Sequence, residues 1–236
     1  KVSSTFSAPT PIRRVVQLDD TMFEKYDTST MRILIANAAP WSYALKKEYL
    51  ERFPEKSLFE IYGSTELGVN TVLTPEYQLS KPGSCGRPSP GVEIVLIDED
   101  GDEVTEPNKP GEVFIRSASI FTTYHKAQEK FDADRRGDFQ TVGDIAYRDE
   151  EGFYFICDRK NDMIISGGMN IYPAEIEDAL YHHPDILDVA VFGIPSEEWG
   201  ESVHAAVVAR PDSGLSEDGI GAFSRERLAS YKIPRS

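Results

Sequence analysis

A glycine turn that carries a hydroxyl group and a carboxylate follows a short apolar segment early in the chain. The apolar segment is Ser57–Ile61, and the turn is Tyr62-Gly-Ser-Thr-Glu66. Just past the end of a strand, such residues suit a phosphate group and a hard metal ion, which prefers oxygen ligands. Taken alone, five residues of this kind are more often an ordinary turn. The weight of this candidate therefore depends on what accompanies it.

A second candidate stretch runs from Asp158 to Glu177. It begins with polar and charged residues, continues with the glycine pair Gly167 and Gly168, and then reaches Pro173. Two adjacent glycines let the backbone adopt positive φ and let a ligand approach without a Cβ in the way. Proline suits the first turn of a helix, where the helix dipole also favours an acidic residue such as Glu175. The pattern predicts a seam between two structural units.

Four stretches, in this order along the chain, resemble signatures of the acyl-adenylate-forming enzymes. This superfamily includes acyl-CoA synthetases, peptide-synthetase adenylation domains and beetle luciferases. The stretches are Tyr62-Gly-Ser-Thr-Glu66, Gly111-Glu-Val113, Thr141-Val-Gly-Asp144 and residues 158–177. Four ordered motifs over most of the chain argue strongly against chance. The segments after Ile164 and after Gly193 look most like bacterial fatty-carboxylate or aryl-carboxylate ligases.

The resemblance implies an α/β fold made of α+β pieces. The expected parts are the C-terminal portion of a large adenylate-forming domain and then a small mobile α/β domain. We expect residues 1–160 to form the partial AMP-binding domain, with an α/β part at 1–73 and a β-rich subdomain at 74–160. Residues 161–236 are expected to form part of the mobile domain. Short apolar runs between Pro and Gly turns in 74–110 independently favour a small twisted sheet or barrel.

Hydrophobic periodicity predicts the elements that carry these motifs. Residues 1–20, interrupted by Pro9 and Pro11, are expected to be extended, and residues 121–140 to form a solvated loop or helix end. Strands are predicted at Met31–Ala36, Ser57–Ile61, Val92–Ile97, Glu112–Arg116, Leu187–Ile194 and Ser202–Ala209. Helices are predicted from Pro40 to about Phe53, at Ala174–His182 and at Leu215–Ser230.

The resemblance also implies which residues contact the nucleotide and the thiol. Tyr62 is expected to stack on the adenine, Thr65 to contact the α-phosphate, and Glu66 to help hold Mg2+. A loop against the adenine begins at Asn37, where the family has glycine, and Asn tolerates left-handed φ. The full expected binding set is Asn37, Ala38, Ala39, Pro40, Tyr62, Gly63, Ser64, Thr65, Asp144, Arg159, Ser166, Gly167 and Gly168, with Glu66 for the metal.

Thr65, Glu66 and Arg159 are the residues expected to be catalytic. Asp144 is expected to bind the ribose hydroxyls, for which a carboxylate is a natural acceptor. A lone Gly-Asp pair is usually just a turn. Its position ahead of Arg159 is what favours a functional role for Asp144. Within the seam, the resemblance expects the Ser166-Gly167-Gly168 loop to line a tunnel for the thiol, although two glycines can also simply end a strand.

The reaction implied by the resemblance uses ATP, Mg2+, a small-molecule carboxylic acid and coenzyme A. The carboxylate attacks the α-phosphorus of ATP and releases pyrophosphate, and a thiol then displaces AMP from the acyl-AMP to give a thioester. Neither half needs a nucleophile from the protein. Catalysis of this kind depends on positioning and on neutralising charge on oxygen atoms.

Three departures from the family pattern stand out. A loop with a lysine for the β- and γ-phosphates is not found ahead of Ser57, and the segment 231–236 stops before the lysine that assists adenylation. Losing one such charge typically costs about 3–4 kcal/mol, so we expect this chain alone to be nearly inactive and read it as the C-terminal part of a longer enzyme. At the hinge, Asn161 replaces the usual Asp or Lys and carries no charge.

Composition bounds the remaining choices. The 236 residues carry a formal charge of -15 and are 40% hydrophobic. An acidic chain argues against nucleic acid or an anionic membrane surface as the main partner. With only Cys85 and Cys157, neither a disulfide framework nor metal-ligand spacing is present, so the cytoplasm is the expected location. No apolar run has the length of a membrane span, and the resemblance allows a homodimer.

Two alternatives stay open at this point. An adenylation domain that loads a carrier-protein thiol is close in sequence, although Phe6–Thr10 lacks the aspartate that usually holds an amino-acid substrate. A non-catalytic nucleotide-binding module is the other alternative. The presence of Glu66, Asp144 and Arg159 speaks against it, because decayed sites tend to lose charged residues first. The identity of the carboxylic acid is open, since most residues of an acyl pocket would lie upstream.

Overall fold

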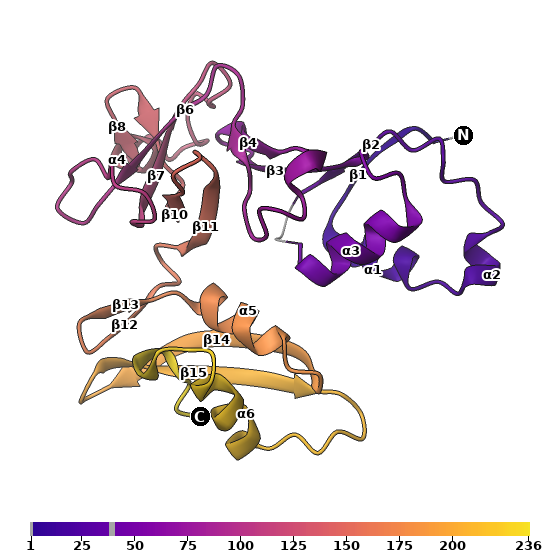
Figure 1. The fold of residues 1–236 in the computed structure, drawn as a ribbon. Helices are drawn as coiled ribbons and strands as arrows, with labels where there is room; N and C mark the ends of the chain where they lie inside the picture. Colours follow the sequence, from indigo (N-terminus) through magenta and orange to yellow (C-terminus); the bar gives the residue numbers. More distant parts are fainter. Residues whose placement is uncertain (1, 38–40) are drawn as a thin grey trace. The chain divides into compact units, whose positions relative to one another are not determined.

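The computed structural model of the protein describes residues 2–37 and 41–236 (Figure 1). The chain divides into two compact units. Unit 1 comprises Lys1–Val142 and Ala146–Ile156, and unit 2 comprises Gly143–Ile145 and Cys157–Ser236. Helices and several sheets make this a mixed α/β structure, as predicted. The expected limits of the two domains, 1–160 and 161–236, stay predictions.

A five-stranded sheet opens unit 1, and its strands follow one another in chain order. They are β1 (Ser4–Ser7), β2 (Ile33–Ala36), β3 (Leu58–Ser64), β4 (Gly68–Leu73) and β5 (Arg87–Pro88). The pairs β1·β2 and β2·β3 are parallel, whereas β3·β4 and β4·β5 are antiparallel. Helix α3 (Tyr43–Arg52) and helix α1 (Pro9–Val16) pack through Leu45 and Ile12 into the core that includes Leu34 of β2.

Helix α1 contradicts the extended structure that we expected for residues 1–20. Both prolines lie in its first turn, where the missing N–H groups would have no partner inside the helix in any case. Ile12 and Val16 are one helical turn apart and buried, whereas Arg13 and Arg14 face solvent. The helical spacing of two apolar residues therefore outweighs the β-preference of valine. A short helix, α2 (Asp20–Phe23), follows.

A second sheet completes unit 1 and extends to the start of unit 2. Its core contains Leu67, Val113, Ile115, Ala146 and Tyr154. The strands run in the order β11-β10-β7-β9-β8, and β6 pairs with β7. Their bounds are Glu93–Ile97 (β6), Gly111–Arg116 (β7), Arg135–Arg136 (β8), Phe139–Gln140 (β9), Asp144–Arg148 (β10) and Tyr154–Arg159 (β11). The strands predicted near β6 and β7 are confirmed.

The segment 121–140 is more ordered than the solvated loop that we predicted. It contains helix α4 (Gln128–Ala133) and the short strands β8 and β9. Phe131 of α4 is buried and meets Phe121 edge to face, with ring centroids 5.1 Å apart. A single aromatic residue among charged neighbours thus anchors the segment to the unit, and charge content alone gave no sign of it.

Unit 2 is built around a four-stranded sheet with the order β13-β12-β15-β14. Figure 1 shows helices α5 and α6 beside its long strands, and both contribute to one core with Ile176 and Phe223. The elements are β12 (Ile164–Ser166), β13 (Met169–Ile171), α5 (Pro173–Tyr181), β14 (Ile186–Ser196), β15 (Gly200–Ala209) and α6 (Glu217–Arg225). The predicted elements are confirmed, although α6 is shorter than Leu215–Ser230.

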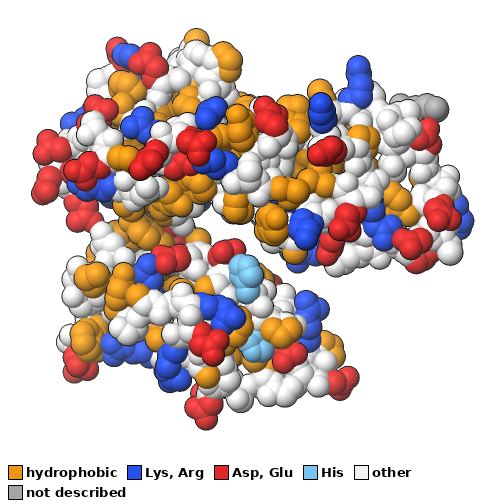
Figure 2. All heavy atoms as spheres, in the orientation of Figure 1, with side chains coloured by type: hydrophobic (Ala, Val, Ile, Leu, Met, Phe, Trp, Pro, Cys, Tyr) orange, Lys and Arg blue, Asp and Glu red, His pale blue; other side chains and the backbone are white. Residues whose placement is uncertain are grey.

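Charged side chains of both signs are interspersed over the face of the molecule drawn in Figure 2. Among the described residues, none of the helices combines the length and the apolar character that a bilayer span requires. Two ionic contacts of low exposure lie within unit 1, one between α3 and the first sheet and one at the β10–β11 turn.

Lys46 of α3 and Glu60 of β3 form a buried ion pair beneath the first sheet. Their side chains are 1% and 11% exposed, so both charges are removed from water. Burial raises the pKa of the Glu60 carboxyl, and the Lys46 ammonium offsets that effect only in part. Removing one member would leave the other as an uncompensated buried charge.

We predict that Lys46→Ala destabilises the protein by about 3–5 kcal/mol, because it leaves the Glu60 carboxylate buried without a counter-charge. Urea unfolding at neutral pH measures the change. The exposed neighbour Lys47→Ala is the matched control and should cost under about 0.5 kcal/mol. The double variant Lys46→Met with Glu60→Leu leaves no unpaired buried charge. It should therefore lose less free energy of unfolding than Lys46→Met alone. A double variant as unstable as the single one would contradict this account.

Asp149 organises the turn between β10 and β11. Its Oδ1 accepts the N–H groups of Glu151 (3.0 Å) and Phe153 (2.9 Å), and its Oδ2 lies 2.8 Å from Lys81 Nζ. Burial alone would raise the pKa of this carboxyl, but Lys81 and the Phe153 N–H outweigh it and hold the pKa below its ordinary value. The ionised carboxylate is therefore the form that the folded turn prefers.

A carboxyl with a lowered pKa stabilises the fold above its unfolded pKa, and this contribution is lost as the pH falls through the folded pKa. We predict that Asp149→Ala costs about 1.5–3 kcal/mol at neutral pH. The difference from wild type should shrink steadily as the pH is lowered below about 4. Urea unfolding across this range tests the prediction, with the exposed neighbour Glu150→Ala as control. A pH-independent difference would refute it.

Candidate active site

The first candidate turn begins inside a strand and not after it. Strand β3 continues through Tyr62 to Ser64, and Thr65–Leu67 form the connection to β4. Gly63 has no room for a side chain, because a Cβ there would lie 2.1 Å from the Gly68 carbonyl oxygen. The prediction that strand Ser57–Ile61 ends before the glycine was thus wrong, since the close pairing with β4 extends β3 by three residues. Thr65 is exposed at the turn.

Glu66 is held from two sides by the segment before α4. The Tyr124 hydroxyl donates to Glu66 Oε1 at 3.2 Å, and the Phe121 N–H donates to the Glu66 carbonyl at 2.8 Å. Burial first, and the Glu66 carboxylate second, raise the pKa of the Tyr124 hydroxyl, so it remains a donor. Sequence reasoning missed Tyr124, because it is 58 positions from Glu66 and belongs to no motif.

One carboxylate oriented in this way fits a role in holding Mg2+. Magnesium is usually held by one or two carboxylates together with water and substrate phosphates, and all of these supply oxygen. Within the described residues, no group of three or more His, Cys, Asp and Glu side chains could form a complete metal site. A contribution from Glu66 alone is therefore compatible with a metal that arrives with a phosphate ligand.

Asp144 and Arg159 come together at the beginning of unit 2. Asp144 starts β10 and Arg159 ends β11, and Arg159 Nε lies 3.6 Å from Asp144 Oδ1. The Asp144 side chain is 12% exposed, whereas that of Arg159 is 74% exposed. Gly143 has a φ of +83°, and its carbonyl accepts the Lys160 N–H at 2.7 Å. The arrangement presents a fixed carboxylate beside a cation that faces solvent.

Asp158 ties this junction to helix α5. Its Oδ1 accepts the Arg159 N–H at 2.8 Å and its Oδ2 accepts the Ala174 N–H at 3.0 Å. Ala174 lies in the first turn of α5, where N–H groups lack partners inside the helix. Sequence reasoning identified Pro173 and the acidic start of this helix but not the distant carboxylate. Asp158 directly precedes Arg159, which could have drawn attention to it.

Ser166, Gly167 and Gly168 form the tip of the β12–β13 hairpin. Ser166 pairs with Met169, and the two glycines between them have φ values of +59° and +78°. Positive φ at both central residues is typical of the tight turns that join antiparallel strands. The expectation that these glycines allow positive φ is confirmed. Asn161 lies in the turn after β11, and its role as a hinge stays a prediction.

The predicted adenine loop lies mostly outside the described residues. Ala38, Ala39 and Pro40 are not described, so their role stays a prediction. Asn37 is described, and its N–H donates to the Ser7 carbonyl at 3.4 Å. Among the described residues outside glycine, positive φ occurs at Asn108, Lys126 and Asp212. Asn37 is not among them, so it does not use the left-handed conformation that this residue type tolerates.

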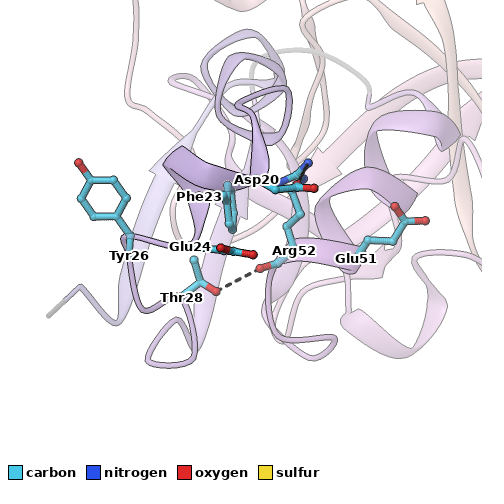
Figure 3. A pocket seen from close by; sticks show the side chains of 7 residues that line it. All are labelled: Asp20, Phe23, Glu24, Tyr26, Thr28, Glu51 and Arg52. Carbon is cyan, nitrogen blue, oxygen red and sulfur yellow. Dashed lines mark hydrogen bonds and ion pairs between the residues drawn. The ribbon is translucent and has the colours of Figure 1, made fainter.

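One cavity of unit 1 lies apart from the predicted site residues. It measures about 420 Å³ and opens between α2 and the end of α3, as Figure 3 shows. Arg52 forms a 3.0 Å ion pair with Asp20, and its carbonyl accepts the Thr28 hydroxyl at 3.1 Å. The cavity is lined by Asp20, Phe23, Glu24, Tyr26, Thr28, Glu51 and Arg52. Arg52 is the one cationic residue in this lining and is already paired with Asp20, so the cavity offers no evident phosphate site.

The model of the family described as AMP-binding enzyme matches residues 1–125, and that of the AMP-binding enzyme C-terminal domain matches residues 175–236. The chain is 35% identical to a long-chain-fatty-acid–CoA ligase of Bacillus subtilis, over 90% of this chain and 38% of that protein. The chain spans less than half the length of the curated relatives that it matches.

Two solved structures have closely similar folds. One is an O-succinylbenzoate coenzyme A synthetase of Bacillus subtilis in complex with ATP and magnesium ion, with a TM-score of 0.86, 31% identity and coverage of 99% of this chain and 47% of that one. The other is an amide bond synthetase of Marinactinospora thermotolerans, with a TM-score of 0.89, 28% identity and coverage of 99% and 47%. With motifs and two family models in agreement, this chain belongs to the AMP-binding enzyme family.

Proposed function

We propose that the whole protein is an ATP-dependent carboxylate–CoA ligase that acts through an acyl-AMP intermediate. The observation that carries the proposal is the exposed Arg159 guanidinium beside the Asp144 carboxylate. A solvent-facing cation suits a phosphate oxygen, and a carboxylate suits the two hydroxyls of a ribose. The names of the relatives, which are ligases of long-chain fatty acids and of 2-succinylbenzoate, support the acid and thiol parts of the proposal.

In the first half of the proposed reaction, a carboxylate oxygen of the acid attacks the α-phosphorus of ATP. The bond from that phosphorus to the oxygen leading to the β-phosphorus breaks, and pyrophosphate leaves. We assign Thr65 to the α-phosphate and Arg159 to phosphate oxygens on which charge develops. We assign Asp144 to the ribose, with Tyr62 against the adenine next to Gly63 and Ser64. Such groups act by positioning and electrostatics and transfer no proton themselves.

We assign Glu66 to Mg2+, which supplies neutralisation of phosphate charge when it is bound. The Tyr124 hydrogen bond supports this assignment, because a ligating carboxylate that is itself hydrogen-bonded keeps one orientation. The complex of a structural relative with ATP and magnesium ion supports the same pair of ligands.

In the second half, the thiol of coenzyme A loses its proton to solvent and its sulfur attacks the acyl carbonyl carbon. AMP leaves with the electron pair of the broken C–O bond. We assign Ser166, Gly167 and Gly168 to the path of the thiol. A hairpin tip with two glycines allows a long, thin group to pass close to the backbone. A carrier-protein thiol in place of coenzyme A is the related alternative.

A second candidate acceptor is an amine, which would give an amide in place of the thioester. The likeness to an amide bond synthetase favours this candidate. Both candidates share the acyl-AMP step and differ only in what consumes it. Supplying the acyl-AMP-forming protein with coenzyme A or with an amine therefore separates them by product mass.

Three finer attributes belong to the same proposal. A role in fatty-acid metabolism is supported by the long-chain-fatty-acid–CoA ligases among the relatives. A cytoplasmic location is supported by two cysteines that are both free thiols. A homodimer stays a prediction that size-exclusion chromatography with light scattering can check.

We predict that the whole protein containing this chain releases pyrophosphate from ATP and Mg2+ only when a suitable carboxylic acid is present. The panel should include aliphatic acids of increasing length and aryl acids. Glu66→Gln should lower the rate about 10²–10³-fold, because it removes one preorganised charge. Coupled pyrophosphate detection measures both effects.

The exposed Glu106→Gln is the matched control and should keep the wild-type rate. A wild-type protein that releases no pyrophosphate with any acid would sink the ligase proposal and favour a non-catalytic nucleotide-binding module. A Glu66→Gln variant with full activity would remove Glu66 from the site while leaving the ligase proposal intact.

We predict that Tyr124→Phe raises the Mg2+ concentration needed for half-maximal pyrophosphate release by about 10-fold. The hydroxyl no longer orients Glu66, but the ring stays packed against Phe121. Titration of Mg2+ at saturating ATP and acid provides the measurement, and Tyr43→Phe, at an exposed tyrosine of α3, is the control. An unchanged Mg2+ dependence would show that the hydrogen bond has no role in holding the metal ligand.

A further inference from the structure

The hairpin tip in unit 2 has one side held by a tryptophan and one side open. The Gly167 N–H donates to the Trp199 carbonyl at 2.8 Å. A Cβ on Gly167 would lie 2.9 Å from Trp199 Cε3 and 3.3 Å from Cζ3, whereas a Cβ on Gly168 would meet nothing within 4 Å. The indole ring therefore lies directly against Gly167 and leaves Gly168 uncovered.

Trp199 is not a core residue of the unit. The residue is 37% exposed, and it does not belong to the buried cluster around Ile176 and Leu180. Burial of apolar area therefore does not by itself explain an indole ring at this position. Its contacts are with Gly167 at the hairpin tip, with Ser196 and with Arg235.

Two contacts fix Trp199 in place. Its backbone N–H donates to Ser196 Oγ at 3.3 Å, and the following Gly200 has a φ of +79° that turns the chain into β15. The Arg235 guanidinium lies 4.6 Å from the centroid of the indole ring, within the range of a cation–π contact. Arg235 is in turn held by its N–H, which donates to the Val203 carbonyl at 2.9 Å.

The base of the hairpin is anchored separately from its tip. Ile164 and Ile171 are buried in the core, and the Ile165 N–H donates to Glu201 Oε2 at 2.7 Å. The register of β12 with β15 includes the pair Ser166 and Gly200. Among the contacts between described residues beyond that pair, those of Trp199 reach the glycine turn. Glycine has the largest conformational freedom of all residues, so this turn would otherwise sample many states.

We propose that Trp199 is a positioning residue that holds the Ser166-Gly167-Gly168 turn in one conformation for the attack of the thiol on the acyl-AMP. The proposal rests on the function proposed above, because that function assigns the turn to the thiol path. Trp199 acts through Gly167 and touches no reacting atom. Its loss therefore affects thioester formation and spares the formation of acyl-AMP.

The first test compares the two half-reactions in the whole protein. Trp199→Ala should lower kcat/KM for coenzyme A about 10–100-fold, because a misplaced positioning element costs about that much. Acid-dependent exchange of pyrophosphate into ATP should change less than about twofold. Trp199→Phe, which keeps an aromatic ring near Gly167, should restore most of the loss, and the exposed neighbour Glu198→Ala should match wild type in both assays.

The second test uses the two glycines as a matched pair. Gly167→Ala and Gly168→Ala both place alanine at positive φ, so they share the backbone strain. Only Gly167→Ala also collides with Trp199, so it should lower thioester formation further than Gly168→Ala. In a Trp199→Ala background this excess loss should disappear, as a double-mutant cycle measures.

A third readout does not depend on activity. Amide hydrogen exchange of the peptide spanning 165–171 should become about 10-fold faster in Trp199→Ala and return close to wild type in Trp199→Phe. Unchanged exchange, equal losses in both half-reactions, or an excess loss at Gly167 that persists without Trp199 would each overturn the proposal. A wild-type protein with no pyrophosphate exchange would overturn the ligase function, while hydrogen exchange still decides whether Trp199 holds the turn.

Discussion

The carboxylate of Asp158 is the contact on which the arrangement of unit 2 depends. It accepts N–H groups from Arg159 and from Ala174, 16 residues further along the chain. The helix that starts there, α5, has Tyr172 at its N-cap position, which is not one of the residue types that cap helices well. A carboxylate supplied from the end of β11 satisfies the first turn and complements the helix dipole. The same side chain thus sets the start of a helix and the backbone direction of Arg159.

Two of the segments that we assign to the site have a backbone fixed by close contacts. Gly63 lies against the Gly68 backbone, and Gly167 lies against the Trp199 ring. Loops that lack such contacts lose entropy when they bind a ligand. A backbone that is already fixed in this way removes part of that cost before the ligand arrives.

The sequence was most informative where the pattern was local. Pro173 and the spacing of Ile176 and Leu180 predicted helix α5, and the order of the four motifs predicted the family. Helix α1 was missed because Pro9 was read as a break, although proline fits a first helical turn. The support of Glu66 by Tyr124 could not be predicted, since it joins residues 58 positions apart through a pairing that only the fold creates. Local patterns report elements, whereas contacts between elements depend on packing.

The bonds around Asn161 define what a pivot at that residue would have to break. On one side, Lys160 donates to the Gly143 carbonyl and Arg159 pairs with Asp144, so these residues would turn together. Other hydrogen bonds join residues on the two sides of Asn161. The Asp158 carboxylate accepts the Ala174 N–H, and the Arg159 carbonyl accepts the N–H groups of Asp162 and Met163.

Hydrogen bonds of this kind contribute about 0.5–1.5 kcal/mol each, and about 1.5–3 kcal/mol where one partner is charged. Breaking the bonds that join the two sides is therefore a cost that the differential binding of one substrate could offset. The uncharged Asn161 fits this arrangement, because the resistance to rotation would come from backbone bonds and the Asp158 carboxylate and would not require an ion pair at the pivot itself.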